Sequence, residues 1–405
     1  MSWAETPEYP YDNPYKATIL GTPAGCAFPL PKNAEPGMRR LETQDRNVPE
    51  VFWYAKGMGY AVQLQDKPAP LIFLVAGTGA RHDASKMLFL ERLFYAQGYH
   101  VVGLTSPTHF NFLVNASKHV IAGYVPFDVD DLWRVMRWIR EDLEQECEIT
   151  GYRLAGYSLG GLQSAFLAER DSRERVFDFE NVLLINPAVD LYSSALTFES
   201  WLAGPGQEAL EQAVQILVKE FTEFYKNNDV GNLDGEAILA FFQDLNLTDA
   251  QMRALIAASF RMTAASMIFT SDVCMHAGYI VPADKALTST DPLLPYFDAA
   301  SQITFKEYFE EFLYPYIRYV LPGMSQEQAL AECSLRRIEE FLQASPKVFV
   351  VGNADDPILQ PEEVDFLRST FGERVALFPH GGHCGNLNYV RFAEKMLEFS
   401  GPEGN

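Results

Sequence analysis

Short apolar runs alternate with segments of helical spacing over residues 50–190, and this alternation constrains the fold more than any other feature of the chain. The runs are bounded by Gly, Pro or Asn, and they lie at 71–76, 100–104, 152–155 and 182–185. Apolar runs of this length are typical of strands buried on both faces. Strands that alternate with helices predict an α/β fold with a mostly parallel central sheet flanked by helices.

Two further segments between these strands have the period of helices, at 85–97 and 129–145. The second follows closely on Asp128, and acidic residues are favourable at a helix N-terminus. Before the first buried strand, the segments 51–54 and 59–64 have the composition of strands. We interpret them as an opening hairpin.

The pattern changes after Asn186-Pro187, where helical spacing replaces the alternation until about residue 345. Several of these helices follow a Ser, Thr or Asp that can cap them. We expect helices at 207–226, 235–245, 248–270, 305–320 and 325–343. The alternation then resumes with strands at 347–351 and 375–378 and helices at 362–370 and 389–399.

We therefore divide the chain into three parts. Residues 1–45, rich in Pro, Tyr and Gly, are expected to form an irregular strap over the surface. Residues 46–190 and 346–405 form the α/β core. A large helical insert, residues 191–345, is placed as a cap or lid before the strand at 347–351. A chain of 405 residues with 48% hydrophobic content is long enough for such a core and insert.

The five residues Gly156-Tyr157-Ser158-Leu159-Gly160 stand between a strand pattern and a helix pattern. A serine on such a sharp turn has its hydroxyl exposed at the end of the sheet, and glycines two positions away let strand and helix approach closely. The N–H of Leu159 then points to where negative charge develops on an attacked carbonyl. We interpret Ser158 as a nucleophile on this turn.

A serine hydroxyl is a poor nucleophile and needs a base, which in turn needs an orienting acid. Carboxylates follow the strand at 347–351, in the segment 352–359, and histidines follow the strand at 375–378, in the segment 380–385. The carboxyl ends of strands are where open α/β sheets place their sites. The order along the chain is Ser, Asp, His.

These three separated features resemble the α/β-hydrolase superfamily, most of all its serine esterases and lipases. The resemblance covers about residues 50–190 and 346–400 and leaves out the helical insert. It implies a catalytic triad of Ser158, His383 and Asp356. His383 follows the pair Gly381-Gly382, as the family pattern has it, whereas His380 is given a structural role in the loop.

The triad acid has two candidates. Asp355 stands three residues after Gly352, which is a familiar spacing, whereas Asp356 precedes Pro357-Ile358-Leu359 and matches the family's Asp-Pro-apolar-apolar pattern. We favour Asp356, because the apolar pair after it packs the loop against the body. Asp355 is then expected to cap a helix or loop.

The resemblance also places a second oxyanion donor in the loop Ala76-Gly77-Thr78-Gly79-Ala80, where Ala76 stands in place of the family's usual histidine. By position the donor is the N–H of Thr78, with Gly79 as the alternative. Together with Leu159 it forms the predicted oxyanion hole. Neither glycine turn carries the Gly-Lys-Ser/Thr of a phosphate-binding loop, so we expect no nucleotide and no other cofactor.

Composition argues against some classes of binding partner and favours one cellular compartment. A net charge of −22 argues against nucleic acid and anionic membranes as partners. The five cysteines are odd in number and widely spaced, which favours reduced thiols and a cytoplasmic location, with Cys384 as a small buried thiol. We see no signal peptide, and no window approaches the ~18 apolar residues of a membrane span. The remaining histidines have no partner at a metal-ligand spacing, and the oligomeric state is not readable.

We expect a serine hydrolase that cleaves a small-molecule carboxylic ester through an acyl-enzyme on Ser158. An acyltransferase or a carbon–carbon hydrolase with the same triad is the first alternative, and a non-catalytic binding protein on a hydrolase scaffold is the second. Large apolar side chains of the helical insert could line an acyl pocket, although each is individually more typical of a core: Phe241, Phe242, Phe260, Met262, Met267, Phe269, Tyr308, Phe309, Phe312, Tyr314 and Tyr316. For the apolar stretch 255–269 we favour burial against the sheet over contact with lipid.

Overall fold

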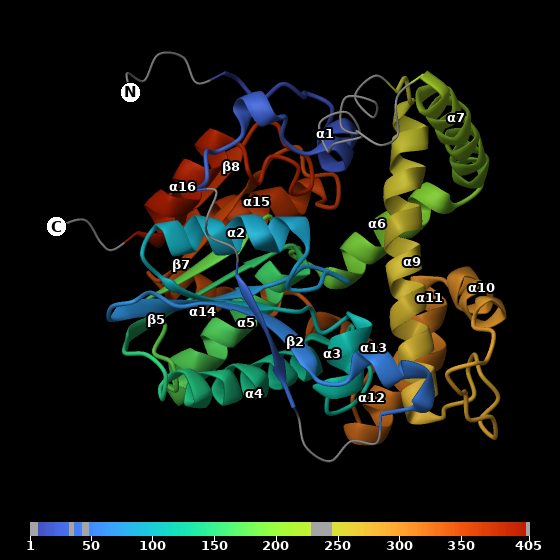
Figure 1. Ribbon diagram of the computed structural model, residues 1–405, viewed down its shortest axis with the longest axis horizontal. Helices are drawn as coiled ribbons and strands as arrows, with labels where there is room; N and C mark the ends of the chain where they lie inside the picture. Colours follow the sequence, from blue (N-terminus) through green and yellow to red (C-terminus); the bar gives the residue numbers. More distant parts are fainter. Residues whose placement is uncertain (1–6, 32–35, 43–47, 228–244, 402–405) are drawn as a thin grey trace.

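A computed structural model of the chain describes residues 7–31, 36–42, 48–227 and 245–401. In these residues the chain builds one sheet of eight strands with helices on both faces and a helical region at one end (Figure 1). The predicted α/β class with a mostly parallel sheet is confirmed.

The strands follow the order β1-β2-β4-β3-β5-β6-β7-β8 across the sheet. Strand β2 runs antiparallel to both of its neighbours, and every later pair is parallel. Their bounds are β1 Gly37–Leu41, β2 Met58–Gln63, β3 Ala69–Val75, β4 His100–Leu104, β5 Ile149–Tyr157, β6 Asn181–Ile185, β7 Val348–Asn353 and β8 Val375–Phe378. The parallel strands therefore end at one edge, which is where loops can gather functional groups.

The two faces of the sheet are covered by different helices. Leu71, Phe73 and Val75 of β3 belong to one buried cluster, together with residues of α4 (Val125–Leu143) and α5 (Leu159–Glu174). Ile72 and Leu74, which alternate with them, belong to a second cluster with residues of α2 (Ser85–Ala96) and α16 (Val390–Ser400). Because both faces are buried, the strand reads as a continuous apolar run.

Two predictions for the N-terminal part are wrong. Val51–Tyr54 is not a strand: it lies in a 3-10 helix, Glu50–Ala55, where Phe52 packs edge-on against Phe269 of the helical insert. The strand that pairs with β2 is instead β1, from the segment expected to be irregular. The same segment also forms α1 (Pro14–Leu20), capped by the side chain of Asn13. Tertiary contacts decide both outcomes.

Helix boundaries in the core shift by a few residues. Helix α4 begins earlier than expected, at Val125, with Pro126 in its first turn. Asp128 therefore lies in the first turn of α4, where it is buried and accepts hydrogen bonds from the Gly123 N–H and the Gln163 side chain. Helix α15 (Pro361–Phe371) and α16 lie where the sequence predicts them.

The described residues of the helical insert form helices and helical turns joined by loops, such as the one at 276–293. Its helices α9 and α13 both begin with a capping box, from Thr248 and Ser325 respectively. The helix expected at 235–245 lies almost wholly outside the described residues. The helical elements are α6 Leu191–Leu202, α7 Pro205–Asn227, α9 Asp249–Met275, α10 Leu294–Gln302, α11 Phe305–Glu307, a π-helical turn Tyr308–Leu313, α12 Tyr314–Val320, α13 Gln326–Ala331, a 3-10 turn Leu335–Ile338 and α14 Glu339–Ala344.

Helix α9 is the long upright helix of the insert in Figure 1 and packs against α1, α3 (Phe110–Asn115), α6, α7 and α10. It is the one helix of the described residues long and apolar enough to cross a membrane by length and composition, contrary to the expectation that no segment qualifies. Half of its most apolar window is buried inside the protein. Core helices pass the same test, so we describe α9 as a core helix of the insert.

Candidate active site

The turn between β5 and α5 has the strained backbone that the sequence predicts. Ser158 has φ 56° and ψ −125°, a left-handed conformation that is costly for a residue with a side chain. A Cβ atom at Gly156 would overlap the carbonyl of Gly160, and one at Gly160 would overlap the carbonyl of Val75 in β3. Only glycine fits at either position, so the turn is as sharp as a nucleophile elbow requires.

A chain of hydrogen bonds joins Ser158, His383 and Asp356. His383 Nε2 lies 2.7 Å from Ser158 Oγ, and His383 Nδ1 lies 2.9 Å from Asp356 Oδ2 and 3.2 Å from Oδ1. Because a carboxylate only accepts, the Nδ1–H donates to Asp356 and Nε2 is left to accept the serine proton. Residues 158, 356 and 383 follow β5, β7 and β8 respectively, so the sheet edge brings them together.

Asp356 is buried, with 3% of its surface exposed. Besides His383, it accepts hydrogen bonds from the side-chain amide of Asn186 at 3.1 Å and from the N–H of Ile358 at 3.2 Å. Four contacts therefore fix a carboxylate that burial alone would make costly. Asn186 directly follows β6 and has a positive φ of 41°.

Asp355 has a different task from its neighbour. Its carboxylate accepts the N–H groups of Gly382 at 2.9 Å and Gly381 at 3.3 Å, and His380 Nδ1 lies 3.7 Å away. Burial raises the pKa of Asp355. It holds the glycine pair that precedes His383, which is the loop-capping role expected for the aspartate outside the triad.

The electrostatic setting of His383 favours its protonated form. Burial is the largest single effect and lowers the pKa of the imidazole, but the raising effects, led by the adjacent Asp356 carboxylate, together exceed it and hold the pKa above its ordinary value. The neighbouring Cys384 acts in the same direction. Cys384 itself is buried, as predicted, and all five cysteines are free.

The loop after β3 lies directly against the elbow. A Cβ atom at Gly77 would come within 3.1 Å of Ser158 Cβ. The N–H of Gly79 donates to Thr108 Oγ1 at 2.7 Å, so this amide is occupied. Among the described residues, the amides of Thr78 and Leu159 donate to no protein acceptor. Of the two donors considered for this loop, Thr78 is therefore the one available for a ligand.

Helix α9 closes over the same loop. A Cβ atom at Gly79 would overlap the γ-methyl group of Thr263, and Gly79 has a positive φ of 66°. Ser259, Thr263 and Ser266 share a helix face at i, i+4 and i+7 spacing, with Met262 at its border. This face of α9 is therefore turned toward the loop that carries Thr78.

Most of the large apolar residues considered for an acyl pocket are core residues. Met267, Phe269, Tyr308, Phe309 and Phe312 are buried. Phe260 is partly buried and stacks on Phe198, whereas Met262 is 54% exposed. Phe241 and Phe242 lie outside the described residues, and Tyr314 and Tyr316 pack against the main core.

The other histidines make local contacts. His82 bonds to Thr105, His100 to the N–H of Gln65, and His119 to Tyr316, while His109 caps α3. His276 ends α9 in a left-handed conformation. No group of three or more His, Cys, Asp and Glu side chains among the described residues is arranged to hold a metal ion.

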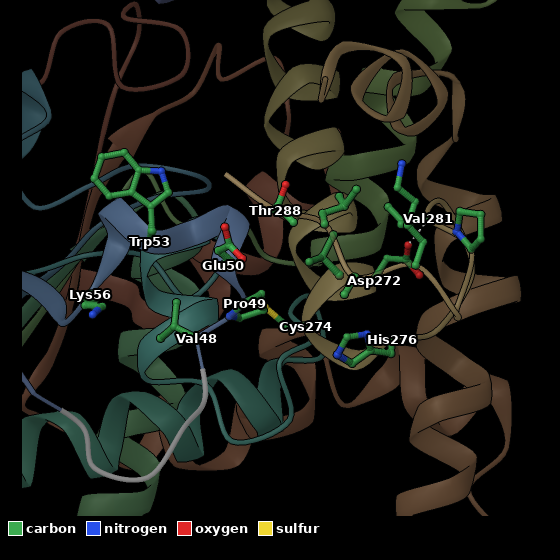
Figure 2. Close-up of a pocket in the computed structure, with 15 residues that line it drawn as sticks. Val48, Pro49, Glu50, Trp53, Lys56, Asp272, Cys274, His276, Val281 and Thr288 are labelled. Atoms are coloured by element: carbon green, nitrogen blue, oxygen red, sulfur yellow. Dashed lines mark hydrogen bonds between the residues drawn. The ribbon is translucent and has the colours of Figure 1, made fainter. Parts of the chain in front are cut away.

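A cavity of about 530 Å³ lies elsewhere, between the 3-10 helix Glu50–Ala55 and the C-terminal end of α9. Figure 2 shows Trp53 and Glu50 on one side of it and Asp272, Cys274 and His276 on the other. Its lining does not include Ser158, Asp356 or His383. Asp272 accepts three backbone N–H groups of the following loop, so its carboxylate is already used for local structure.

Sequence reasoning missed four residues at the site: Asn186, Thr108, Thr18 and Thr263. Asn186 carried a signal, because it is a polar residue at the carboxyl end of a predicted strand. The threonines carried none, since a single hydroxyl in a loop or helix reaches the site only through tertiary contacts.

Solved structures with related folds include a carboxyl esterase 2 from the fungus Tuber melanosporum, at 15% identity and a TM-score of 0.45 over 95% of this chain and 96% of that one. A hyperthermophilic esterase from Pyrobaculum calidifontis matches at 12% identity and 0.43, over 92% and 87%. The thioesterase domain of a curacin biosynthetic pathway matches at 13% and 0.42, over 91% and 100%.

No protein-family model matches the sequence, and a comparison with curated proteins gives no match. The strand order, the single antiparallel strand β2 between β1 and β4, and the strained turn after β5 carry the assignment. The chain has the α/β-hydrolase fold.

Proposed function

We propose that this protein is a serine hydrolase that cleaves carboxylic esters through an acyl-enzyme on Ser158. The observation that carries the proposal is the hydrogen-bond chain from Ser158 Oγ to His383 Nε2 and from His383 Nδ1 to Asp356, at 2.7 and 2.9 Å. Nucleophile, base and orienting acid at such distances are the arrangement that acyl transfer requires.

In the first half-reaction, Ser158 Oγ attacks the ester carbonyl carbon while His383 Nε2 takes the hydroxyl proton. Asp356 holds the imidazole and stabilises the imidazolium that forms. When the tetrahedral intermediate collapses, His383 returns the proton to the departing alkoxide. The alcohol leaves and the acyl group stays on Ser158.

The negative charge on the tetrahedral oxygen needs hydrogen-bond donors. The unoccupied amides of Leu159 and Thr78 are the groups we assign to this role. Leu159 also stands at the N-terminus of α5, where the helix dipole favours negative charge. Losing one such donor typically costs about 3 to 4 kcal/mol of transition-state stabilisation.

In the second half-reaction, water takes the place of the alcohol. His383 accepts its proton, the hydroxide attacks the acyl-enzyme, and the acid leaves as the proton returns to Ser158 Oγ. The acyltransferase and carbon–carbon hydrolase alternatives differ only in the acceptor or the bond cleaved. Turnover in ¹⁸O-water decides between water and another acceptor, because hydrolysis places the label in the released acid.

We further propose that the acyl group is apolar. Met262 is half exposed at the border of the α9 face whose Thr263 contacts Gly79. An exposed methionine one position before Thr263 on α9 offers an adaptable apolar surface to an acyl chain. A panel of p-nitrophenyl esters should show higher kcat/KM for medium chains than for acetate, and Met262→Ser should reduce that preference.

A fluorophosphonate probe tests the central proposal. Wild-type protein should be labelled at Ser158, and Ser158→Ala should abolish labelling. Ser172→Ala is the matched control, because Ser172 is an exposed serine of the same helix α5. Absence of label on the wild-type protein, or equal labelling of Ser158→Ala, contradicts the proposed function.

A further inference from the structure

The N-terminal helix α1 packs directly on the loop that carries His383. Thr18 Oγ1 accepts the backbone N–H of His383 at 2.9 Å and donates its own proton to the Pro14 carbonyl at 2.6 Å. Thr22 Oγ1 donates to the Gly385 carbonyl at 3.1 Å. The side chains of Thr18 and Thr22 therefore hold the backbone on either side of Cys384.

The packing between α1 and this loop leaves no free space. A Cβ atom at Gly382 would overlap the Pro14 carbonyl, and one at Gly385 would overlap the Ala17 carbonyl. Ala17 has no exposed surface. The backbones of α1 and of this loop lie so close together that only glycine fits at the two loop positions. The loop therefore has no room to move toward α1.

The other side of α1 is attached to the helical insert. The Asn13 side-chain amide donates to Asp249 at 2.8 Å, and the Tyr15 ring contacts Trp201 of α6 edge-on. Arg253 of α9 lies over the Tyr15 ring. Figure 1 shows α1 between the C-terminal part of the core and one end of α9. The segment 13–22 thus links the histidine loop to α6 and α9.

The imidazole of His383, its backbone N–H and the two glycines before it are each held by a different partner. The imidazole contacts Ser158 and Asp356, and the preceding glycines are held by Asp355. The backbone N–H of His383 itself is held only by Thr18 among the described residues. When a buried N–H loses its acceptor, the backbone shifts toward another acceptor. The imidazole attached to that backbone then moves with it.

We propose that Thr18, through its hydrogen bond to the His383 backbone, is a positioning residue for the catalytic base. The inference rests on the proposed function. Thr18 acts through the His383 backbone and touches no substrate, so its loss should lower the rate of the chemical step and leave substrate binding unchanged. Misplacement of a catalytic group by about 1 Å lowers rates on the order of 100-fold.

The test compares Thr18→Val, which keeps the shape and removes the acceptor, with Thr18→Ser, which keeps the hydroxyl and removes the methyl group. Both are assayed for kcat and KM with p-nitrophenyl acetate and for the rate of fluorophosphonate labelling. We expect kcat of Thr18→Val to fall about 10- to 100-fold with KM within about twofold of wild type, and Thr18→Ser to retain kcat within about threefold.

Two further variants control for folding and for a general effect of the segment. Asn13→Ala loosens α1 at its far end and leaves the Thr18 hydroxyl in place, so its kcat should stay close to that of the wild type. Rates are referred to folded protein, measured by near-UV circular dichroism. If Thr18→Val does not fold, Thr18→Ala replaces it, because the smaller side chain introduces no new contact.

The inference is overturned if folded Thr18→Val keeps wild-type kcat, if Thr18→Ser is impaired as much as Thr18→Val, or if the whole effect lies in KM. These results leave the proposed function standing, since the wild-type protein is still labelled at Ser158. A wild-type protein that takes no label overturns the proposed function, and the role of Thr18 with it.

Discussion

Two adjacent carboxylates, Asp355 and Asp356, point in different directions and serve different parts of one loop. Asp356 contacts the His383 imidazole, whereas Asp355 accepts the N–H groups of the preceding glycines. Two neighbouring residues thus have different tasks: Asp356 interacts with the imidazole, and Asp355 holds the backbone of the loop. Sequence spacing alone did not decide which of the two aspartates contacts the histidine, because both follow the same strand end.

Replacing these aspartates by asparagine separates their tasks. Asp356→Asn leaves the shape intact but fails to hold the imidazole in the tautomer that accepts the serine proton, so kcat should fall on the order of 10⁴-fold. Asp355→Asn, the matched control, should fall by no more than about tenfold, because it weakens only hydrogen bonds to two N–H groups. Steady-state kinetics with one ester measures both, and equal losses would contradict the assignment.

The raised pKa of His383 predicts where activity is lost in acid. Only the neutral imidazole accepts the serine proton, so kcat/KM should rise with pH through the pKa of His383. Because Asp356 raises that pKa, the midpoint should lie above about 6.5, the ordinary value for histidine. A pH–rate profile measures it.

His380→Gln is the control for this profile. The His380 side chain is half exposed and its Nδ1 lies 3.7 Å from Asp355, not against His383, so the midpoint should not change. A wild-type midpoint at or below the ordinary histidine value, or one that moves in His380→Gln, would show that another group controls the rate.

At the scale of elements, the sequence predicted best where burial on both faces leaves little choice. Strands β3 to β6 appear as apolar runs because helices cover both sides of them. Edge strand β1 was missed, since it carries Arg39 and Arg40 and has only one neighbour. The 3-10 helix at Glu50–Ala55 was mistaken for a strand because Val51 and Phe52 are apolar for a different reason, namely contact with the helical insert.

The same reasoning explains the predicted site. Ser158, Asp356 and His383 were predicted because each follows a strand end, where the strands of a parallel sheet meet at one edge, and because the motifs around them resemble those of the α/β-hydrolase superfamily. Contacts made by loops and helices across that edge, such as those of Thr18 and Thr263, follow from packing that no local pattern encodes. The three residues that the structure brings together were thus predictable by number, and the residues that support them were not.

The elbow between β5 and α5 should tolerate no side chain at Gly160. Its Cβ would overlap the backbone carbonyl of Val75, so Gly160→Ala must displace β3 or the helix. We expect a loss of several kcal/mol in the free energy of unfolding, on the order of an overpacked core, together with loss of activity. Gly25→Ala is the control, since a Cβ at Gly25 meets nothing within 4 Å. Urea unfolding measures both variants, and equal stability of the two would argue against the steric role.

Helix α2 carries a buried carboxyl group beneath the sheet. Glu91 is 1% exposed, both of its side-chain oxygens lack a hydrogen-bond partner among the described residues, and it abuts Gly103 of β4. Burial, with a smaller effect of Asp83, raises its pKa from 4.5 to about 8. The folded protein therefore holds a proton that the unfolded chain releases.

The titration of Glu91 changes the free energy of unfolding in a definite direction. Since the folded pKa is the higher one, the stabilisation is complete below about pH 4.5 and is lost progressively as the pH rises to about 8. Glu91→Gln removes the titration, so it should gain stability relative to wild type across that window, at no more than about 1.4 kcal/mol per pH unit. Urea unfolding at pH 5 and pH 8 tests this. The exposed Glu141→Gln should follow the wild type at both values.

At the scale of the whole molecule, charge and surface set the expected partners. The net charge of −22 disfavours anionic surfaces, and helix α9 keeps half of its most apolar window inside the protein. We therefore expect the protein to stay in the supernatant when vesicles of phosphatidylglycerol are sedimented at low salt. Vesicles of phosphatidylcholine, which lack net charge, provide the comparison. Sedimentation with both would point to insertion of an apolar surface such as that of α9.

The contact between Thr18 and His383 spans 365 positions of the chain. A ribosome makes α1 first and the histidine loop only after nearly all of the sheet and the helical insert have been made. Until then the Thr18 hydroxyl lacks the His383 N–H that it accepts, and the nascent chain carries Ser158 without its proposed base. For the proposed hydrolase, activity should therefore first appear only after the histidine loop has been synthesised.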